Sequence, residues 1–297
     1  MLNAYEMGGQ HMAVCGVCWR HCRLDEGQTG FCNARINRKG TITGLYYGAV
    51  SSLALDPIEK KPLRRFHPGG RILSIGSLGC NLRCPFCQNH EIAQPDRNRT
   101  FSVQTEYVSP ERIAETAERC REMGNLGAAF TYNEPLVGYE FVRDTARLVH
   151  DRGMLNVLVT NGTASREVFD EVIPYVDAMN IDLKGFTDRY YSSVLQGDRH
   201  MVMDFIQLAV QRCHVELTTL IIPGENDSDE EIRQLSEWIA GLSNVFGGKK
   251  GYDIPLHISR FFPQYHMTDR GPTDVGRIYH LADVARENLR DVFTGNC

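Results

Sequence analysis

Short runs of apolar and β-branched residues alternate, from residue 71 onward, with longer stretches whose apolar positions recur at helical spacing. The short runs predict six strands, at residues 71–76, 127–132, 155–160, 178–183, 215–222 and 255–259. The amphipathic stretches predict the helices, at residues 110–123, 136–152, 165–175, 200–212 and 228–242. Ser109, and Asp227 or Ser228, precede two of these helices and have the side chains of N-cap residues.

This alternation predicts an α/β fold in which parallel strands are joined by right-handed crossovers. Periodicity alone leaves two architectures open, a partial (β/α) barrel and an open doubly wound sheet. In both, ligands bind beyond the carboxyl ends of the strands. Polar segments follow the predicted strands at residues 79–80, 133–135, 160–162, 182–184, 223–225 and 260–263. We therefore expect the functional site among these segments.

The chain before residue 71 has a different composition. Residues 1–12 are rich in Gly and Met without a period, and we expect a flexible tail. Residues 13–40 hold four cysteines and several arginines but are too few for a hydrophobic core, so this segment needs a metal to be ordered. We thus divide the chain into the tail, a Cys-rich metal-binding segment with its linker at residues 13–69, and the α/β unit at residues 70–297.

Composition narrows the classes of function. The 297 residues are 42% hydrophobic and carry a formal net charge of −5, which argues against a protein that binds nucleic acid mainly by electrostatics. No apolar run has the length of a membrane span, and the first residues lack the layout of a signal peptide, so we expect a cytoplasmic protein. In a reducing compartment, ten cysteines indicate metal binding rather than disulfides.

Three cysteines, Cys80, Cys84 and Cys87, lie close together just after the first predicted strand. A [4Fe–4S] cluster is held by cysteine thiolates, and a short loop of this kind can supply three of them. Without a fourth protein ligand, one iron stays open to a substrate or cofactor. The alternative is a zinc site completed by His90 or a distant residue, but zinc ligands usually come as two pairs on facing elements.

The spacing Cys80-x3-Cys84-x-Phe86-Cys87 after a strand resembles the defining motif of the radical S-adenosylmethionine (SAM) superfamily. The segments at residues 56–63, 66–69, 74–76 and 79–89 are similar to one branch of that superfamily. This branch resembles pyruvate formate-lyase activating enzymes and is called the radical SAM protein of the AmmeMemoRadiSam system. The resemblance covers nearly the whole chain. It implies an enzyme with a partial (β/α)6 barrel that cleaves SAM reductively to methionine and a 5′-deoxyadenosyl radical, which abstracts hydrogen from an unidentified substrate.

The resemblance also implies roles for residues at the strand ends. Asn133 and Glu134 stand where the superfamily has a Gly-Gly-Glu-Pro segment, whose carboxylate accepts hydrogen bonds from the ammonium of SAM. The glycine pair is replaced here by Tyr-Asn. Thr160 and Asn161 match a Thr-Asn-Gly segment near the ribose and carboxylate of SAM, although the aspartate before it is a valine in this chain. Read without the resemblance, Glu134 is an ordinary strand-end carboxylate and residues 160–162 are a turn.

Asp182 and Lys184 match the Asp-x-Lys pair of the activating enzymes and point the same way from their strand. The lysine is expected to neutralise the SAM carboxylate or to bind an anionic substrate, and a plain salt bridge is the alternative. The predicted catalytic set is Cys80, Cys84, Cys87 and Lys184. The predicted cofactor-binding set is Phe86, Asn133, Glu134, Thr160, Asn161, Asp182, Lys184, Ile222, Pro223, His257 and Arg260. For His257, a hydrogen-bonding role in the core is an equal alternative.

The N-terminal motif Cys15-x2-Cys18-x3-Cys22-x9-Cys32 offers four thiolates, a full set for zinc or for a second [4Fe–4S] cluster. Arginines within the same segment can offset part of the negative charge of such a site. At the other end, relatives of this branch often continue past a similar Gly-Asn with a Cys-rich tail. We therefore expect that the chain is short at Cys297, either naturally or because that piece is missing.

Two classes of function remain at this point. The first is a radical SAM enzyme, which either activates a glycyl radical enzyme or modifies another peptide, a nucleotide or a small molecule. Its expected partners are SAM, a reducing protein such as flavodoxin or ferredoxin, and a protein or peptide substrate; a membrane and nucleic acid are not expected. The second is a non-catalytic zinc-binding interaction protein, which leaves the strand-end residues unexplained.

Overall fold

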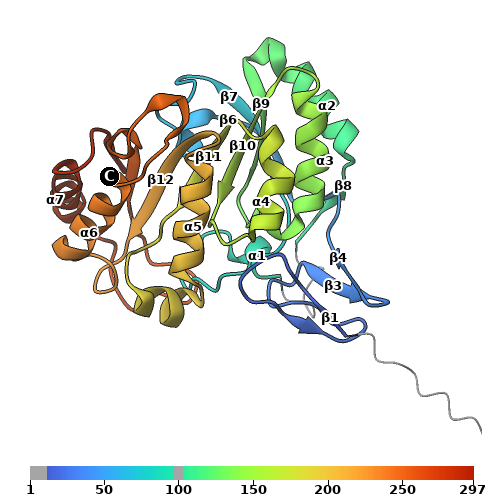
Figure 1. Ribbon diagram of the computed structural model, residues 1–297, viewed down its shortest axis with the longest axis horizontal. Coiled ribbons are helices and arrows are strands. Elements are labelled where there is room, and N and C mark those ends of the chain that lie inside the picture. Colours follow the sequence, from blue (N-terminus) through green and yellow to red (C-terminus); the bar gives the residue numbers. More distant parts are fainter. Residues whose placement is uncertain (1–11, 96–102) are drawn as a thin grey trace, which may run out of the picture.

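An eight-stranded sheet forms the centre of the computed structural model, which describes residues 12–95 and 103–297 (Figure 1). In spatial order its strands are β14 (Val292–Gly295), β13 (Leu256–Arg260), β12 (His214–Ile221), β11 (Ala178–Asp182), β10 (Leu155–Thr160), β9 (Asn125–Thr131), β7 (Arg71–Gly76) and β6 (Ser52–Pro57). Neighbouring strands from β14 through β7 in this spatial order pair in parallel. At one edge, β6 pairs antiparallel with β7. The two edge strands of this order are not neighbours, so the sheet is a partial barrel.

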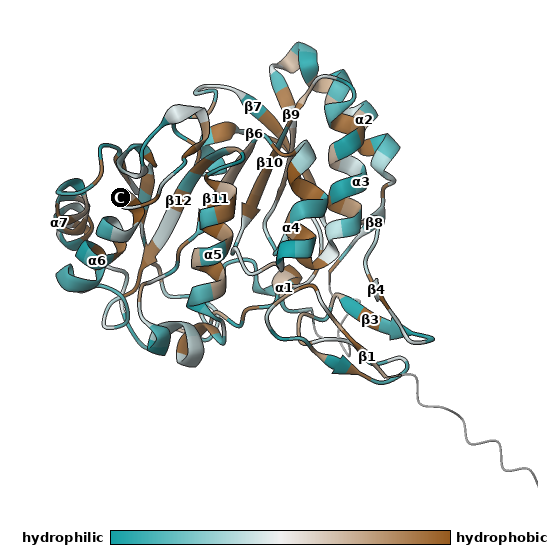
Figure 2. Cartoon of the chain, viewed as in Figure 1, coloured by the Kyte–Doolittle hydropathy of each residue, from teal (hydrophilic) through white to brown (hydrophobic). Residues whose placement is uncertain are grey.

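Helices cover the outer face of this sheet and supply the crossovers between parallel strands. They are α2 (Pro110–Arg119), α3 (Tyr139–His150), α4 (Arg166–Val172), α5 (Arg199–Ala209), α6 (Asp229–Ala240) and α7 (Val275–Arg286). On α3, Val142, Ala146 and Val149 recur at helical spacing and are buried. In Figure 2 the strands are mostly hydrophobic, whereas the helices alternate hydrophobic and hydrophilic faces. The α/β fold and the partial barrel predicted above are thus confirmed.

All six predicted strands and all five predicted helices are present; the strands at residues 71–76 and 155–160 have the predicted ends, and the other elements have shifted ends. The predicted helix at residues 136–152 begins as α-helix only at Tyr139, because Pro135–Gly138 forms a 3-10 turn. The helix that begins at Pro110 changes to a 3-10 turn at Cys120 and ends at Gly124, whose φ is 82°. The Ser109 hydroxyl accepts a hydrogen bond from the Arg112 amide at 3.4 Å, as an N-cap does. Of the two candidates at the later helix, the N-cap is Ser228.

Several elements lay outside the sequence-based prediction. They are β6, β14, α7, the short helix α1 (His90–Ala93), a π-helix at Tyr190–Leu195, and the short strands β1 (Ala13–Val14), β2 (Arg23–Leu24), β3 (Arg35–Arg38), β4 (Thr41–Gly44), β5 (Ala49–Val50) and β8 (Glu106–Tyr107). Strand β6 lies within the predicted linker at residues 13–69, so part of that segment belongs to the barrel sheet. The division of the chain into units stays a prediction. The predicted tail lies, apart from Met12, outside the described residues.

The N-terminal segment forms small antiparallel pairs, β1 with β2 and β3 with β4, and docks at the end of the sheet where the parallel strands terminate (Figure 1). The backbone of Cys18 forms an isolated antiparallel β-bridge with Ala164, four residues after β10 ends. The Ser165 amide donates to the Val17 carbonyl at 2.8 Å. Near β7, a Cβ on Gly79 would lie 2.8 Å from the Cys32 carbonyl oxygen. The Cys-rich segment therefore touches the end of the barrel at which ligands bind in this architecture.

The opposite end of the barrel is closed by the segment after β6. Ile58 and Leu63 are fully buried and pack with Ile72, Ala129 and Val157 from the first strands. None of the helices in residues 12–95 and 103–297 combines the length and apolar character that a membrane-spanning helix requires. The protein thus has one covered end and one end where polar groups gather.

Candidate functional site

The three-cysteine loop leaves β7 at its carboxyl end and folds back over the barrel. Gly79 adopts a φ of 96°, and its amide donates to the carbonyl of Ile92 at 2.8 Å. The Arg83 amide donates to the Leu195 carbonyl at 2.9 Å, and the Cys87 amide to the Cys84 carbonyl at 3.2 Å. These bonds hold the loop in a tight curve beside the π-helix. The curve turns its cysteines towards the barrel.

The thiols of this loop lie within electrostatic reach of one another, since Cys80 interacts with both Cys84 and Cys87. Burial raises the pKa of Cys84 to about 11, and the Lys184 ammonium opposes this rise. Burial likewise raises the pKa of Cys80 and Cys87. A bound cation would reverse this effect, because coordination deprotonates a thiol. Three neighbouring sulfurs beside an ammonium fit the three-thiolate side of an iron–sulfur cluster.

Glu134 ties two strand ends together beneath this loop. One carboxylate oxygen accepts from the Thr160 hydroxyl at 2.8 Å and from the Leu136 amide at 3.0 Å, and the other accepts from the Asn161 amide at 2.7 Å. Burial raises the pKa of Glu134 to about 7, although these hydrogen bonds lower it. The structure therefore brings Glu134, Thr160 and Asn161 together as one network. Asn161 extends this network to the cysteines, because its side-chain nitrogen donates to Cys80 Sγ at 3.6 Å.

Asn133 fixes the start of the cysteine loop. Its side-chain oxygen accepts from the Ser77 amide at 3.0 Å, and its side-chain nitrogen donates to the Gly79 carbonyl at 3.0 Å. Phe86, inside the loop, is buried and packs edge-on to Phe261 beyond β13, with ring centroids 6.5 Å apart. Asn133 thus contacts the loop backbone, and Phe86 anchors the loop to the far side of the barrel.

Asp182 and Lys184 bring the end of β11 to the same place. Lys184 Nζ lies 2.7 Å from an Asp182 carboxylate oxygen, and the Lys184 amide donates to the Tyr191 hydroxyl at 3.0 Å. Burial alone would lower the pKa of Lys184, but Asp182 and Cys84 raise it well above its usual value. The lysine is therefore a permanent cation that acts on both Cys84 and Cys87.

Most of the remaining predicted residues contact groups beyond β12 and β13. Ile222 is buried and its amide donates to the Asn226 side chain at 2.8 Å, while the Pro223 carbonyl accepts from Arg270 at 2.8 Å. Arg260 donates to the Thr273 carbonyl at 2.7 Å and stacks on Phe262. These residues lie at or just beyond the ends of β12 and β13, on the other side of the sheet from β9 and β10.

His257 lies deeper in the barrel, three residues before β13 ends. Its Nε2 is 2.7 Å from a carboxylate oxygen of Glu216, which is fully buried. His214 Nε2 lies 3.0 Å from the other oxygen, and the backbone amides of Arg64 and Arg65 donate to the same carboxylate at 2.9 and 2.7 Å. In this position His257 helps to hold the segment that closes the barrel. Its core role is the alternative that the geometry favours.

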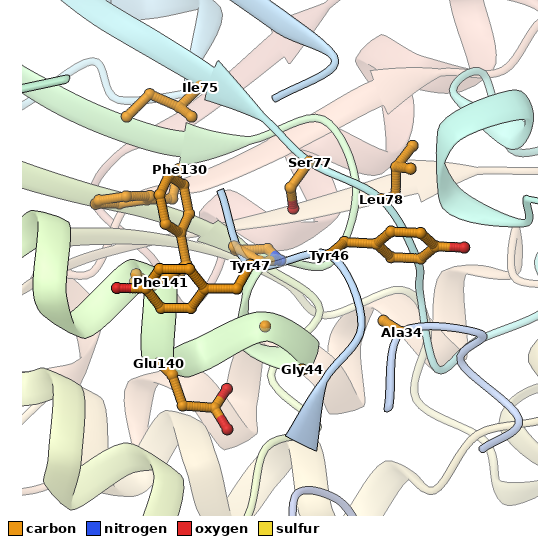
Figure 3. A pocket seen from close by; sticks show the side chains of 13 residues that line it. Ala34, Gly44, Tyr46, Tyr47, Ile75, Ser77, Leu78, Phe130, Glu140 and Phe141 are labelled. Carbon is orange, nitrogen blue, oxygen red and sulfur yellow. The ribbon is translucent and has the colours of Figure 1, made fainter. Parts of the chain in front are cut away.

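A cavity of about 570 Å³ opens beside the cysteine loop. Arg83 and Pro85 of the loop line one side, and Glu225 and Met267 line another. A second pocket, shown in Figure 3 with Phe130 and Phe141 at its wall, measures only about 20 Å³ and so has room for a water molecule at most. The larger cavity therefore has room for part of a substrate beside the cysteine loop.

Sequence reasoning missed the residues that connect the two cysteine groups. The side-chain oxygen of Asn81 accepts a hydrogen bond from the side-chain nitrogen of Asn161 at 3.0 Å, and its side-chain nitrogen donates to the Thr163 hydroxyl at 2.7 Å. Its side chain also forms a hydrogen bond with the Cys18 thiol. The only signal in the sequence was its place beside Cys80. Nothing local in the chain indicates that Cys18 packs against it.

Comparisons with known proteins agree with this geometry. The profile of the Radical SAM superfamily matches residues 74–236. The chain is 38% identical to an uncharacterized protein of Methanocaldococcus jannaschii, over 98% of this chain and 84% of that protein. It is 27% identical to the pyruvate formate-lyase 1-activating enzyme of Escherichia coli K12, over 60% of this chain and 72% of that enzyme.

Two further comparisons concern a second activating enzyme and a solved structure. The indoleacetate decarboxylase activating enzyme of Tractidigestivibacter scatoligenes is 23% identical, over 80% of this chain and 74% of that enzyme. Streptococcus suis SuiB bound to S-adenosylmethionine superposes with a TM-score of 0.57 and 12% identity, covering 76% of this chain and 52% of SuiB. At that identity, SuiB shows a shared fold.

Proposed function

Since the chain belongs to the radical SAM superfamily, we propose that Cys80, Cys84 and Cys87 hold a [4Fe–4S] cluster at the carboxyl end of the barrel. With SAM bound, such a cluster supplies one-electron cleavage to methionine and a 5′-deoxyadenosyl radical, which takes a hydrogen atom from substrate. The observation that carries the proposal is the convergence of three neighbouring thiols with Lys184 and with the Glu134 network. The chain is a radical SAM enzyme related to activating enzymes of glycyl radical proteins.

In this proposal the strand-end residues position SAM. The Lys184 ammonium pairs with its carboxylate, which is an acceptor that a buried lysine can neutralise. Glu134 keeps Thr160 and Asn161 in place and presents a carboxylate to the SAM ammonium. Ile222 and Pro223 border the adenine, and the cofactor set is completed by Phe86, Asn133, Asp182 and Arg260, whereas His257 keeps its core role beside Glu216. The burial of these groups excludes water from the reacting atoms.

For the substrate, we propose a peptide segment of a protein partner that the chain activates as a glycyl radical enzyme. The names of two similar proteins, as activating enzymes, support this choice. The cavity of about 570 Å³ beside the cysteine loop gives a peptide access to the cluster end of the barrel. The motif at residues 56–63 supports placing the chain in the AmmeMemoRadiSam branch. A flavodoxin or ferredoxin is the proposed electron donor, and the N-terminal cysteines are a proposed second metal site.

The test is reductive cleavage of SAM by the full chain. After anaerobic reconstitution, the protein is incubated with SAM and dithionite, and 5′-deoxyadenosine and methionine are measured. We expect both products in equal amounts, and neither without dithionite, because the cleavage consumes one electron. A protein that holds zinc, takes up no iron and forms no 5′-deoxyadenosine would refute the proposal.

Lys184→Ala is expected to weaken SAM binding about tenfold, or about 1.4 kcal/mol, because the SAM carboxylate loses its cation. Iron content should stay unchanged, since Lys184 supplies no ligand. Binding is measured by equilibrium titration of the cluster-loaded protein with SAM. Lys60→Ala is the matched control, because that lysine is exposed, pairs with Asp56 at 3.5 Å and belongs to the segment that closes the opposite end of the barrel. Equal affinity of the two variants would exclude Lys184 from the SAM site.

A further inference from the structure

The four thiols of the N-terminal segment gather in one place. The Cys15 amide donates to the Cys22 carbonyl at 2.9 Å, which brings the two ends of the first loop together. Electrostatic interactions join Cys15 to Cys22, Cys18 to both, and Cys32 to Cys15 and Cys18. Cys15, Cys18 and Cys32 are buried. The segment therefore brings four cysteines into one region, although Cys32 is distant in sequence from the others.

The spacing of these sulfurs suits a cluster better than a single ion. A Cβ on Gly30 would lie 3.7 Å from Cys22 Sγ and 3.8 Å from Cys32 Sγ, so the two sulfurs flank a point at which the chain has no side chain. Within the part of the chain that the structure describes, no three His, Cys, Asp or Glu side chains are close enough to hold one metal ion. Thiolates on separate irons of a cube are farther apart than thiolates that share one zinc.

This N-terminal group is connected directly to the three-cysteine loop. The Asn81 side chain forms a hydrogen bond with the Cys18 thiol, and it accepts one from Asn161 at 3.0 Å. The same Asn161 nitrogen donates to Cys80 Sγ at 3.6 Å. Two carboxamides therefore span the gap between a sulfur of one group and a sulfur of the other. The backbone gives a second connection, because Asn81 directly follows Cys80.

Two arginines between the groups provide positive charge for both. The Cζ atoms of Arg20 and Arg83 lie 3.4 and 3.9 Å from the centre of the Phe31 ring. Arg20 interacts with thiols of the N-terminal group, whereas Arg83 interacts with Cys80 of the loop and with Cys32. Guanidinium groups placed in this way offset the negative charge of thiolate-ligated clusters on either side.

We propose that Cys15, Cys18, Cys22 and Cys32 bind a second iron–sulfur cluster, which exchanges single electrons with the barrel cluster across Asn81. The inference rests on the proposed function, since the barrel cluster is its electron acceptor. Four thiolates close every iron of a cube to substrate, so the second cluster serves electron transfer. A flavodoxin or ferredoxin gives up one electron and is oxidised. That electron reduces the N-terminal cluster, passes to the barrel cluster and is consumed in the cleavage of SAM.

The first test counts metal in variants of the full chain. Wild type is expected to hold about eight irons, and Cys80→Ala/Cys84→Ala/Cys87→Ala about four, with a paramagnetic signal after reduction by dithionite. Cys15→Ala/Cys18→Ala/Cys22→Ala/Cys32→Ala should also hold about four irons. Circular dichroism checks that each variant is folded. Zinc without iron in the barrel-site variant overturns the second cluster, and if wild type still forms 5′-deoxyadenosine, the proposed function survives. Iron at both sites without SAM cleavage refutes the proposed function instead.

The second test addresses electron exchange between the two clusters. In fully reduced wild type, paramagnetic resonance should show a spectrum broadened by interaction of the two clusters. It should differ from the sum of the spectra of the two single-site variants. With a protein donor, Asn81→Ala should slow reduction of the barrel cluster about tenfold at unchanged iron content.

Asn33→Ala is the matched control for Asn81→Ala, because Asn33 directly follows Cys32 as Asn81 follows Cys80, but its side chain donates to the Pro95 carbonyl at 3.0 Å. It should reduce at the wild-type rate. Additive spectra, together with equal rates for the two asparagine variants, overturn the electron exchange.

Discussion

Cys84→Ala is expected to abolish 5′-deoxyadenosine formation and to remove the iron of the barrel site, the largest effect of any single substitution in this chain. Cys84 is the buried residue among the three cysteines, and it interacts with Cys80, Cys87 and Lys184. Two remaining thiolates cannot hold three corners of a cube. The measurement is anaerobic iron and sulfide analysis, followed by chromatography of the products of a SAM and dithionite incubation.

The control for Cys84→Ala is Cys213→Ala. Cys213 is also buried, but it lies at the amino end of β12, where its thiol faces the Ala209 carbonyl. Removing it creates a small cavity without touching the cysteine groups, so iron content and activity should match wild type. Activity that persists in Cys84→Ala would mean that this loop does not hold the catalytic cluster.

Glu216→Ala is expected to lower the free energy of unfolding by about 3–5 kcal/mol, the largest effect on stability away from the cysteines. The carboxylate is fully buried and accepts hydrogen bonds from two histidines and from the amides of Arg64 and Arg65. Its removal leaves all these groups without their partner and loosens the segment that closes the barrel. Chemical denaturation followed by circular dichroism gives the value. Glu237→Ala, at an exposed position of α6, should change stability little.

The stabilisation by Glu216 should also depend on pH. Burial alone would raise its pKa, but the hydrogen bonds from His214, His257 and the two amides lower it from 4.5 to about 2. A carboxylate with a lowered pKa stabilises the folded state above its unfolded value, and this contribution is lost as the pH falls through the folded value. The stability difference between wild type and Glu216→Gln should therefore shrink from pH 4.5 towards pH 2. A difference independent of pH would show that Glu216 is already protonated in the fold.

The local pattern predicted the parallel core well, for a physical reason. A strand buried on both faces is largely apolar, and residues 155–160 and 178–183 are so apart from Asn156, Thr160, Asn180 and Asp182. Edge elements lack this constraint. Strand β6 contains Ser and Asp within Ser52–Pro57, and β14 has only four residues, so neither stands out from a loop. Their pairing with β7 and β13 comes from the closure of the sheet.

For the candidate site, the sequence motif predicted which residues take part, and the fold decided which groups those residues contact. Glu134 was predicted as a SAM ligand, and the structure shows in addition that it joins β9 to β10. Lys61 went unnoticed, although it is buried, lies 2.9 Å from Asp56 and stacks on Tyr132. A lysine next to another lysine in a polar segment normally reads as solvated, because only a tertiary partner justifies its burial.

The amino-acid sequence by itself determined the α/β class, the order of its six central strands along the chain, and the two cysteine groups, because periodicity and ligand spacing are properties of neighbouring residues. Only the tertiary structure decided that Cys18 meets Asn81 beside Cys80, and that His257 turns to Glu216. These contacts join residues 41 or more positions apart, and they depend on how the strands pair and where the N-terminal segment docks. No local pattern encodes such a meeting, since it exists only once the barrel has formed.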